Sequence, residues 1–200
     1  MDEPIIEIDL FVEDRAHEAF LRAIIRRIAR KTGKTAHMCM RSARGGHERA
    51  VSELKLYQRS MLKSRGLHRM PDLIFVAIDA NCESFNAAKK EIAESIEAPF
   101  ADRSVIACPD PHIERWYLAD VRSFGRVVGR QPGTVRQKCA RDVYKSLLTN
   151  TIIRAGHPPM LGGIEFAEEL VNDMDFYRAG KAERSLQHFI NDAVTRIKSA

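Results

Sequence analysis

The feature that most constrains the fold is a regular alternation of short apolar segments with longer amphipathic segments over the first 120 residues. The short segments are rich in β-branched residues, which predicts strands at 5–12 (IIEIDLFV), 35–40 (TAHMCM), 72–79 (DLIFVAID) and 103–108 (RSVIAC). Apolar residues recur with helical spacing between them, which predicts helices at 17–31, 48–63, 84–96 and 112–120. This order predicts an α/β fold, in which a mostly parallel central sheet is flanked by helices.

The pattern changes after residue 120. Residues 125–133 (GRVVGRQPG) predict a connector, and helical spacing then returns at 135–148, 164–174 and 182–197. The segments GHPPMLGG and FYRAGK separate these helices. We therefore expect an α/β domain over residues 1–120 and a helical C-terminal extension over 121–200 that packs on it.

Composition excludes two broad classes. The chain is 44% hydrophobic and 30% charged, which is typical of a globular protein rather than a disordered one. No apolar run approaches the roughly 20 residues that a membrane span needs, and the acidic N-terminus lacks the basic start of a signal peptide. The cysteines are Cys39, Cys82, Cys108 and Cys139. Since they form no CxxC pair, we expect neither a zinc site nor a disulfide framework, as suits the cytoplasm.

Charge is distributed unevenly along the chain. The net charge is +5, but residues 1–14 hold six acids and no Lys or Arg, whereas residues 15–70 hold fifteen Lys or Arg and three Glu. A basic block of this kind is typical of contact with a polyanion such as nucleic acid. Arg41 and Arg44 follow the second predicted strand and are the expected phosphate contacts. The alternative is that these basic side chains form a solvated face.

Acidic residues follow three of the predicted strands. Glu13 comes directly after the first strand, Asp79 ends the third, and Glu114 lies shortly after the fourth. Ligands of open parallel sheets bind at the carboxyl ends of the strands, where these side chains should converge. Clustered carboxylates repel one another unless a cation is present, and Mg²⁺ prefers oxygen ligands. The pattern therefore predicts a metal site for Mg²⁺ or Mn²⁺ at this edge.

Each acid also has a structural interpretation. Asp79 could cap the helix after its strand, and Glu13 could pair with an arginine at the sheet edge. Glu114 could belong to an anchor built around Trp116, the only tryptophan. Asp120 is expected to be a helix-end or salt-bridge residue rather than a ligand.

Three segments together resemble the TOPRIM family. FVEDRAHEAFL matches its first motif, in which a strand leads through a Glu into a helix, and LIFVAIDAN matches the later strand that ends in Asp-x-Asp. PHIERWYLAD is similar to a third segment found in small stand-alone TOPRIM-like proteins related to OLD-type nucleases of bacterial phage-defence loci. Downstream, VRQKCARDVYKSLL, GIEFAEELVNDMDF and SLQHFI extend the resemblance over nearly the whole chain.

The resemblance implies roles for four residues. Glu13 matches the glutamate that acts as a general acid or base or lies beside the metal, and Asp79 matches a Mg²⁺ ligand. Asn81 stands where the second Asp is expected, and Glu114 matches the acid of the third segment. The chain departs from the family at Asp14, which replaces the usual Gly, at His17, where a second acid is common, and at Asn81, which removes a negative charge.

Two functions follow as hypotheses. The first is a Mg-dependent nuclease, or the nuclease subunit of a defence system, that cleaves phosphodiester bonds in DNA or RNA with Glu13 and Asp79 as catalytic residues. The second is a catalytically degenerate TOPRIM scaffold that binds nucleic acid or a partner ATPase without cleavage. A nucleotide-binding regulator is disfavoured, because no strand is followed by GxxxxGKS or GxGxxG. Self-association into a homo-oligomer is left open.

Overall fold

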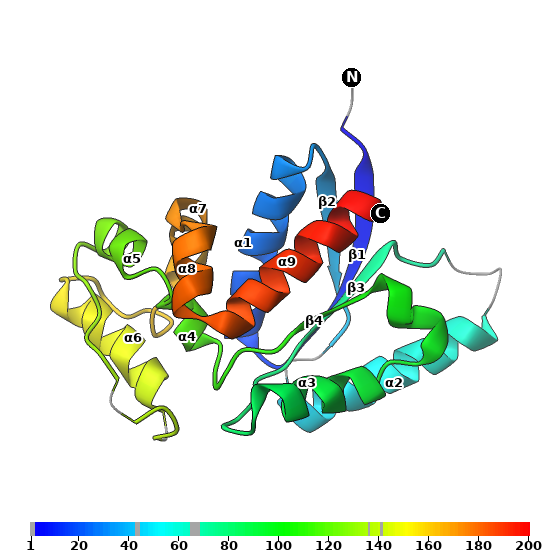
Figure 1. Cartoon of the computed structure of the whole chain (residues 1–200), viewed down its shortest axis with the longest axis horizontal. Coiled ribbons are helices and arrows are strands. Elements are labelled where there is room, and N and C mark those ends of the chain that lie inside the picture. The colour runs from blue at the N-terminus through cyan, green and yellow to red at the C-terminus, as the bar shows by residue number, and fades with distance from the viewer. Residues whose placement is uncertain (1–2, 43–44, 65–68, 136, 141) are drawn as a thin grey trace.

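The centre of the protein is a four-stranded sheet, and the prediction of an α/β fold with a parallel sheet is confirmed. The computed structural model describes residues 3–42, 45–64, 69–135, 137–140 and 142–200. All strand pairs are parallel, and the order across the sheet is β2-β1-β3-β4 (Figure 1). The strands are β1 (Ile5–Val12), β2 (Thr35–Met40), β3 (Leu73–Ala77) and β4 (Ser104–Ala107). Val12 is in register with Ala77 and Ala77 with Ala107, so three strands end at one level.

Helices cover both faces of this sheet. The α1 helix (Arg15–Lys31) and the C-terminal α9 (Arg184–Ser199) lie on one face, whereas α2 (His47–Lys63) and α3 (Phe85–Glu94) lie on the other (Figure 1). A 3-10 helix, η1 (Ala98–Arg103), leads into β4. Every residue of β3 is buried, as its continuous apolar sequence predicted for a strand covered on both faces.

Local sequence signals account for the position of α1. The Asp14 side chain accepts a hydrogen bond from the backbone N–H of His17 at 3.0 Å, which caps the helix. Apolar residues on one face of the helix are buried against the sheet, including Phe20, Ile24 and Ile28. The helix ends before Gly33, whose φ of +71° favours glycine. The same segment that forms this helix therefore fixes His17 at the edge of the sheet.

The C-terminal third differs from the expected helices in several places. It contains α5 (Val121–Val128), α6 (Val143–Arg154), the 3-10 helix η2 (Ile164–Phe166), α7 (Ala167–Asp173), α8 (Phe176–Ala182) and α9. The predicted connector at 125–133 was wrong in its first half, because Asp120 caps α5 by accepting from the backbone N–H of Ser123. The predicted helix at 135–148 begins only at Val143.

Two further boundaries were wrong. The predicted separator FYRAGK forms α8, because the Asp175 side chain accepts from the N–H of Arg178 and starts a new helix. The predicted helix at 112–120 is reduced to α4 (Glu114–Tyr117). The first of these errors arises because the capping Asp175 starts a new helix where the spacing of apolar residues predicted a break.

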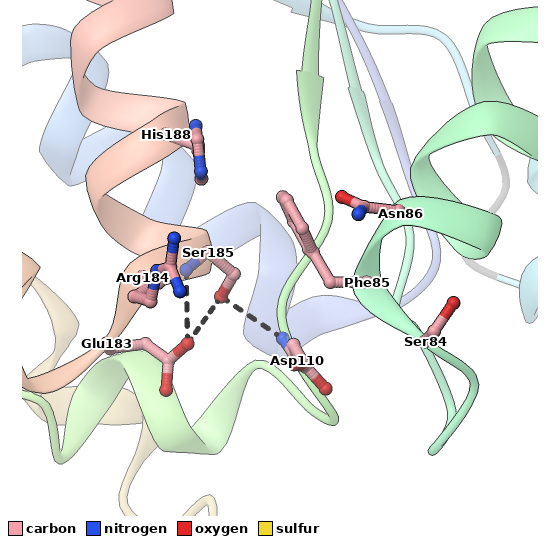
Figure 2. A pocket seen from close by; sticks show the side chains of 8 residues that line it. All are labelled: Ser84, Phe85, Asn86, Asp110, Glu183, Arg184, Ser185 and His188. Atoms are coloured by element: carbon pink, nitrogen blue, oxygen red, sulfur yellow. Dashed lines mark hydrogen bonds between the residues drawn. The ribbon is translucent and has the colours of Figure 1, made fainter.

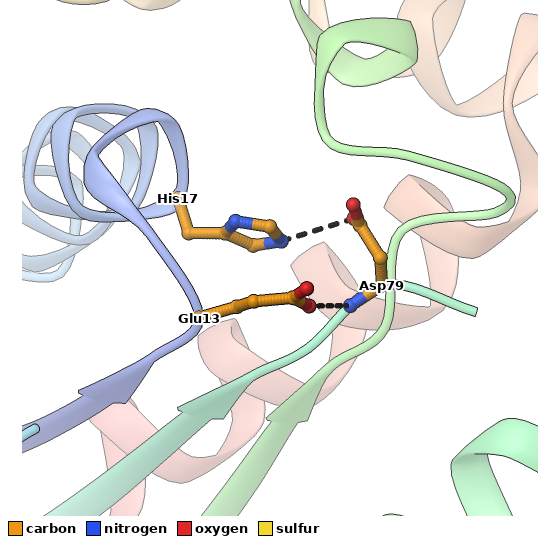
Figure 3. Close-up of side chains that lie close together, drawn as sticks. All are labelled: Glu13, His17 and Asp79. Carbon is orange, nitrogen blue, oxygen red and sulfur yellow. Dashed lines mark hydrogen bonds and ion pairs between the residues drawn. The ribbon is translucent and has the colours of Figure 1, made fainter. Parts of the chain in front are cut away.

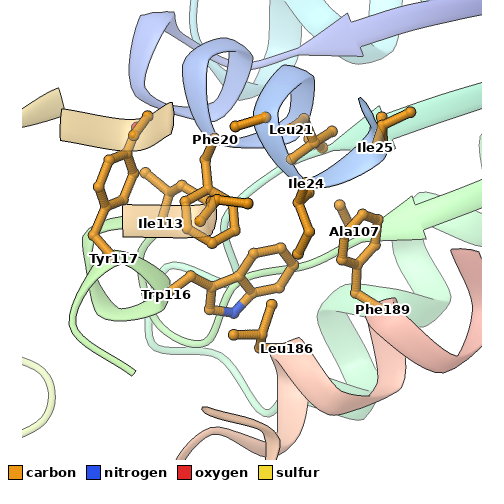
Figure 4. Close-up of a cluster of buried hydrophobic side chains, with 14 of the residues drawn as sticks. Phe20, Leu21, Ile24, Ile25, Ala107, Ile113, Trp116, Tyr117, Leu186 and Phe189 are labelled. Atoms are coloured by element: carbon orange, nitrogen blue, oxygen red, sulfur yellow. The ribbon is translucent and has the colours of Figure 1, made fainter. Parts of the chain in front are cut away.

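An aromatic cluster joins the C-terminal helices to the sheet. Trp116 is fully buried and stacks on Phe189 of α9 with ring centroids 5.2 Å apart, and Phe20 of α1 lies 5.8 Å away (Figure 4). Burial of a large side chain of this kind contributes about 1.5–3 kcal/mol to stability. Trp116 thus anchors the segment after β4 in the main hydrophobic core.

Two cysteines are paired, which corrects the expectation of no disulfide. Cys82 and Cys139 form a disulfide with a Cα–Cα distance of 5.7 Å, and Cys39 and Cys108 are free. Spacing along the chain gave no indication of this, because the two residues are 57 positions apart and meet only in the folded protein. Among the described residues, no helix combines the length and apolar character needed to cross a membrane.

Candidate metal and acid–base site

Glu13, His17 and Asp79 meet at the carboxyl edge of the sheet. Glu13 follows β1, Asp79 follows β3, and His17 lies in the first turn of α1, and one ligand atom of each residue lies within 4.8 Å of the others. Figure 3 shows the His17 ring directed at the Asp79 carboxylate and the Glu13 carboxylate directed at the Asp79 backbone. The predicted convergence of acids from separate strands therefore occurs for Glu13 and Asp79.

His17 joins two carboxylates. Its Nε2 lies 3.0 Å from Oδ1 of Asp79, and its Nδ1 lies 2.8 Å from Oδ1 of Asp14. An ionised carboxylate only accepts hydrogen bonds, so both ring nitrogens donate and the ring is an imidazolium. Burial alone would lower the pKa of His17, but the charge of Asp79 and the hydrogen bonds to both carboxylates raise it well above the usual 6.5.

Asp79 is held by a second histidine from the loop after β4. His112 Nδ1 lies 3.3 Å from Asp79 Oδ2, so each carboxylate oxygen of Asp79 contacts a different histidine. Burial would raise the pKa of Asp79, but the charge of His17 and the hydrogen bonds from both histidines outweigh it and lower this pKa. The hydrogen bond to Asp79 likewise raises the pKa of His112. Asp79 is therefore a buried anion between two histidine rings, and it does not cap the helix that follows, because Ser84 caps α3.

The negative charge of Glu13 has fewer compensating partners than that of Asp79. One oxygen accepts the backbone N–H of Asp79 at 3.1 Å, and in the described part of the chain no arginine pairs with this carboxylate. Burial raises the pKa of Glu13; the positive charge of His17 lowers it in part, and the negative charge of Asp79 adds to the increase. A half-buried carboxyl with a raised pKa is a candidate for proton transfer, and its charged form would be stabilised by a bound cation.

Glu114 borders the same site. It starts α4 and lines a small cavity of about 190 Å³ with Asp14, Arg15 and Lys145, among others. Burial is the main cause of the raised pKa of Glu114, and the negative charge of Asp79 adds to it. Glu114 therefore shares the electrostatic environment of the cluster.

Asn81 and Arg41 lie away from this cluster. Asn81 is exposed and lines a groove between α2 and α3 with Glu83 and Glu91. Arg41 forms an ion pair of 2.9 Å with Asp9, a buried residue in the middle of β1. The Asp9 carboxylate therefore neutralises the charge of Arg41. Arg44 lies outside the described residues.

Part of the basic block serves the fold. The Arg27 guanidinium donates to the backbone carbonyls of Val171 and Met174 and lies 4.3 Å from the centre of the Phe176 ring. Arg22 of the same helix pairs with Glu18 at 2.9 Å. Arg27 therefore fastens α1 to the C-terminal helices, and Arg22 is paired within α1, so these two basic side chains have partners inside the fold.

A second cavity opens beside the loop after β4. It measures about 270 Å³ and lies between the first turns of α3 and α9 (Figure 2). The Ser185 hydroxyl donates to Glu183 at 2.8 Å and accepts from Nε1 of Trp116 and from the backbone N–H of Asp110. These hydrogen bonds attach the loop after β4 to the start of α9. They thereby fix the segment that carries His112.

The two histidines were not among the expected ligands. A sequence signal for His17 exists, because the Asp14-x-x-His17 spacing places the ring in the capped first turn of a helix that directly follows a strand. Nothing in the spacing of His112 predicts its contact with Asp79, which depends on the adjacency of β3 and β4.

Comparison of the chain with protein-family models, with curated proteins and with solved structures gave no significant match. The resemblance to TOPRIM proteins therefore stays a prediction carried by the three sequence motifs.

Proposed function

We propose that the protein is a divalent-metal-dependent phosphodiesterase that acts on DNA or RNA. The observation that carries this proposal is the approach of Glu13, His17 and Asp79 to within 4.8 Å at the carboxyl edge of a parallel sheet. Metal-assisted hydrolysis of phosphodiesters needs this combination of anionic ligands and a group able to transfer a proton.

The donor set fits a divalent ion. Two carboxylates supply the oxygen ligands that Mg²⁺ and Mn²⁺ prefer, and an imidazole nitrogen favours Mn²⁺ over Mg²⁺. The half-buried Glu13 carboxylate lacks an arginine partner among the described residues, which leaves negative charge that a cation would neutralise. When bound, such an ion supplies Lewis-acid stabilisation of charge on the phosphoryl oxygens.

The side chains of the site would supply proton transfer and hold the ligands in position. Glu13, whose pKa is raised by burial, holds or releases the proton of the attacking water or the leaving oxygen. His112 and His17 orient the Asp79 carboxylate from its two sides. For His17 to serve as a ligand, the proton that it shares with Asp79 must leave, so metal binding through the ring strengthens as pH rises.

One observation favours the scaffold alternative. Both oxygens of Asp79 already have histidine partners, so the buried anion is compensated without a metal. Under this alternative, the protein binds nucleic acid or a partner ATPase without cleavage, and the basic surface rather than Asp79 governs binding.

Metal binding and cleavage distinguish the two functions. The protein is incubated with Mn²⁺ or Mg²⁺ and with plasmid, single-stranded DNA or tRNA, and its melting temperature is measured with and without Mn²⁺. We expect Glu13→Gln to lower cleavage by roughly 10²–10⁴-fold, as for loss of a general acid or base. Asp79→Asn should abolish both cleavage and stabilisation by Mn²⁺.

The control is Glu94→Gln, which changes a carboxylate on the exposed side of α3 and should behave as the wild type. Cleavage that persists in both site variants would overturn the proposed mechanism. Salt-dependent nucleic-acid binding with no cleavage and no Mn²⁺ stabilisation in the wild type would establish the scaffold instead.

A further inference from the structure

The turn at residues 137–140 is attached to both loops that carry site residues. Cys139 forms the disulfide with Cys82, three residues after Asp79, and the Lys138 ammonium pairs with Asp110 at 2.6 Å, two residues before His112. Adjacent residues of one turn thus hold the loop after β3 and the loop after β4.

The two loops are also bonded to each other. The N–H of Ala80 donates to the carbonyl of Pro109 at 2.8 Å, and the N–H of Asn81 donates to Pro111 at 3.1 Å. Asn81 and Cys82 have φ values of +48° and +67°, a region that residues other than glycine occupy at a cost in energy. The loop after β3 therefore keeps an unfavourable backbone conformation, and the disulfide is its one covalent restraint.

We propose that the Cys82–Cys139 disulfide is a redox-operated clamp on the edge of the sheet that carries Asp79 and His112. Both cysteines are exposed, so small thiols and disulfides can reach them. In the oxidised protein the clamp fixes the β3 loop, with Asn81 directed into the groove between α2 and α3. Reduction releases this loop from the turn at 137–140, which then remains attached to the β4 loop through the Lys138–Asp110 ion pair, an interaction that salt weakens.

The chemistry is thiol–disulfide exchange. A dithiol reductant attacks one sulfur of the protein disulfide, and its second thiol then displaces the other protein sulfur. The protein gains two thiols while the reductant becomes a disulfide, so two electrons and two protons pass to the protein. Oxidised glutathione reverses the reaction and leaves as two molecules of reduced glutathione.

The experiment combines thiol counting with amide hydrogen exchange of the full chain without added metal. After alkylation in denaturant, the oxidised protein should carry labels on Cys39 and Cys108 alone, and dithiothreitol should add labels on Cys82 and Cys139. The amides of residues 80–83 should exchange roughly tenfold faster or more after reduction, because local opening controls their exchange. Oxidised glutathione should restore the slow exchange.

Two variants make the test specific. Cys82→Ser should show the fast exchange without reductant and no further response to dithiothreitol. Cys39→Ser removes a free cysteine of β2 and should keep the full redox response. Labels on all four cysteines before reduction, or exchange at residues 80–83 that dithiothreitol leaves unchanged, would overturn the clamp. Neither measurement uses metal or nucleic acid, so the result is independent of the proposed phosphodiesterase.

Discussion

The ion pair between His17 and Asp79 gives the most direct stability test of the site. His17→Leu removes an imidazolium that lies 3.0 Å from the Asp79 carboxylate and leaves this buried anion with His112 alone. At an effective dielectric constant of about 20, two unit charges at that separation attract by roughly 5 kcal/mol, part of which offsets desolvation. Loss of one partner of a buried pair typically costs about 3–5 kcal/mol, so we expect the free energy of unfolding to fall by about 3 kcal/mol.

A double-mutant cycle isolates the pair from other effects. In Asp79→Asn the imidazolium keeps Asp14 as a partner, and the double variant leaves no unpaired anion at residue 79. The double variant should therefore be more stable than the sum of the single changes predicts, with a coupling energy of about 1–3 kcal/mol. Urea denaturation with chelator present measures this, and Trp116, buried in the core, supplies a fluorescence probe.

The pH dependence of the same cycle has a defined sign. Because the pKa of His17 is raised, its contribution is complete below the unfolded value of 6.5 and is lost as pH rises through the folded pKa. Because the pKa of Asp79 is lowered, its contribution is complete above 3.8 and is lost as pH falls through the folded pKa. The coupling energy should thus be largest between pH 3.8 and pH 6.5. Glu94→Gln is the control, and a coupling near zero in that window would refute the charged pair.

Three other changes test the fold around the site. Asp120→Ala should lower the free energy of unfolding by about 1–3 kcal/mol, since the buried backbone of Ser123 loses its acceptor; equal urea midpoints would contradict this. Tyr57→Phe removes a hydroxyl that donates to the buried Asp9 carboxylate at 2.5 Å, and an unfolding free energy lower by about 1.5–3 kcal/mol is expected in the same assay. Burial raises the pKa of Cys108 to about 12, so iodoacetamide at pH 8 should label it in denaturant and leave it unmodified in the native protein, as mass spectrometry would detect.

Asp120 shows which interactions of a residue can be predicted from its neighbours in the sequence. It was predicted to be a helix-end or salt-bridge residue, and it caps α5 and pairs with Arg178 at 2.9 Å. The capping role follows from nearby residues, whereas the partner lies 58 positions away. Similarly, the fall in pKa of Asp120 below its usual range comes from hydrogen bonds of Arg178, Asp175 and Ser123 that outweigh burial.

Sequence patterns were enough to predict the sheet and two residues of the site. Apolar periodicity defined the four strands, and parallel pairing brings the residues after those strands to one edge, so Glu13 and Asp79 could be expected to meet. Asp14, as a helix cap, set the first turn of α1 by interactions within four residues.

The remaining groups of the site are brought together by contacts between elements that are distant in the sequence. His112 reaches Asp79 because β3 and β4 are neighbours, and Cys82 meets Cys139 because the chain returns to the same edge after α5. Arg27 likewise donates to backbone carbonyls 144 and 147 residues away. Its charge was expected at a nucleic-acid-binding surface, but it joins α1 to the C-terminal helices instead. Such contacts depend on the packing of distant elements, and the periodicity of a sequence records which face of an element is buried but not what it is buried against.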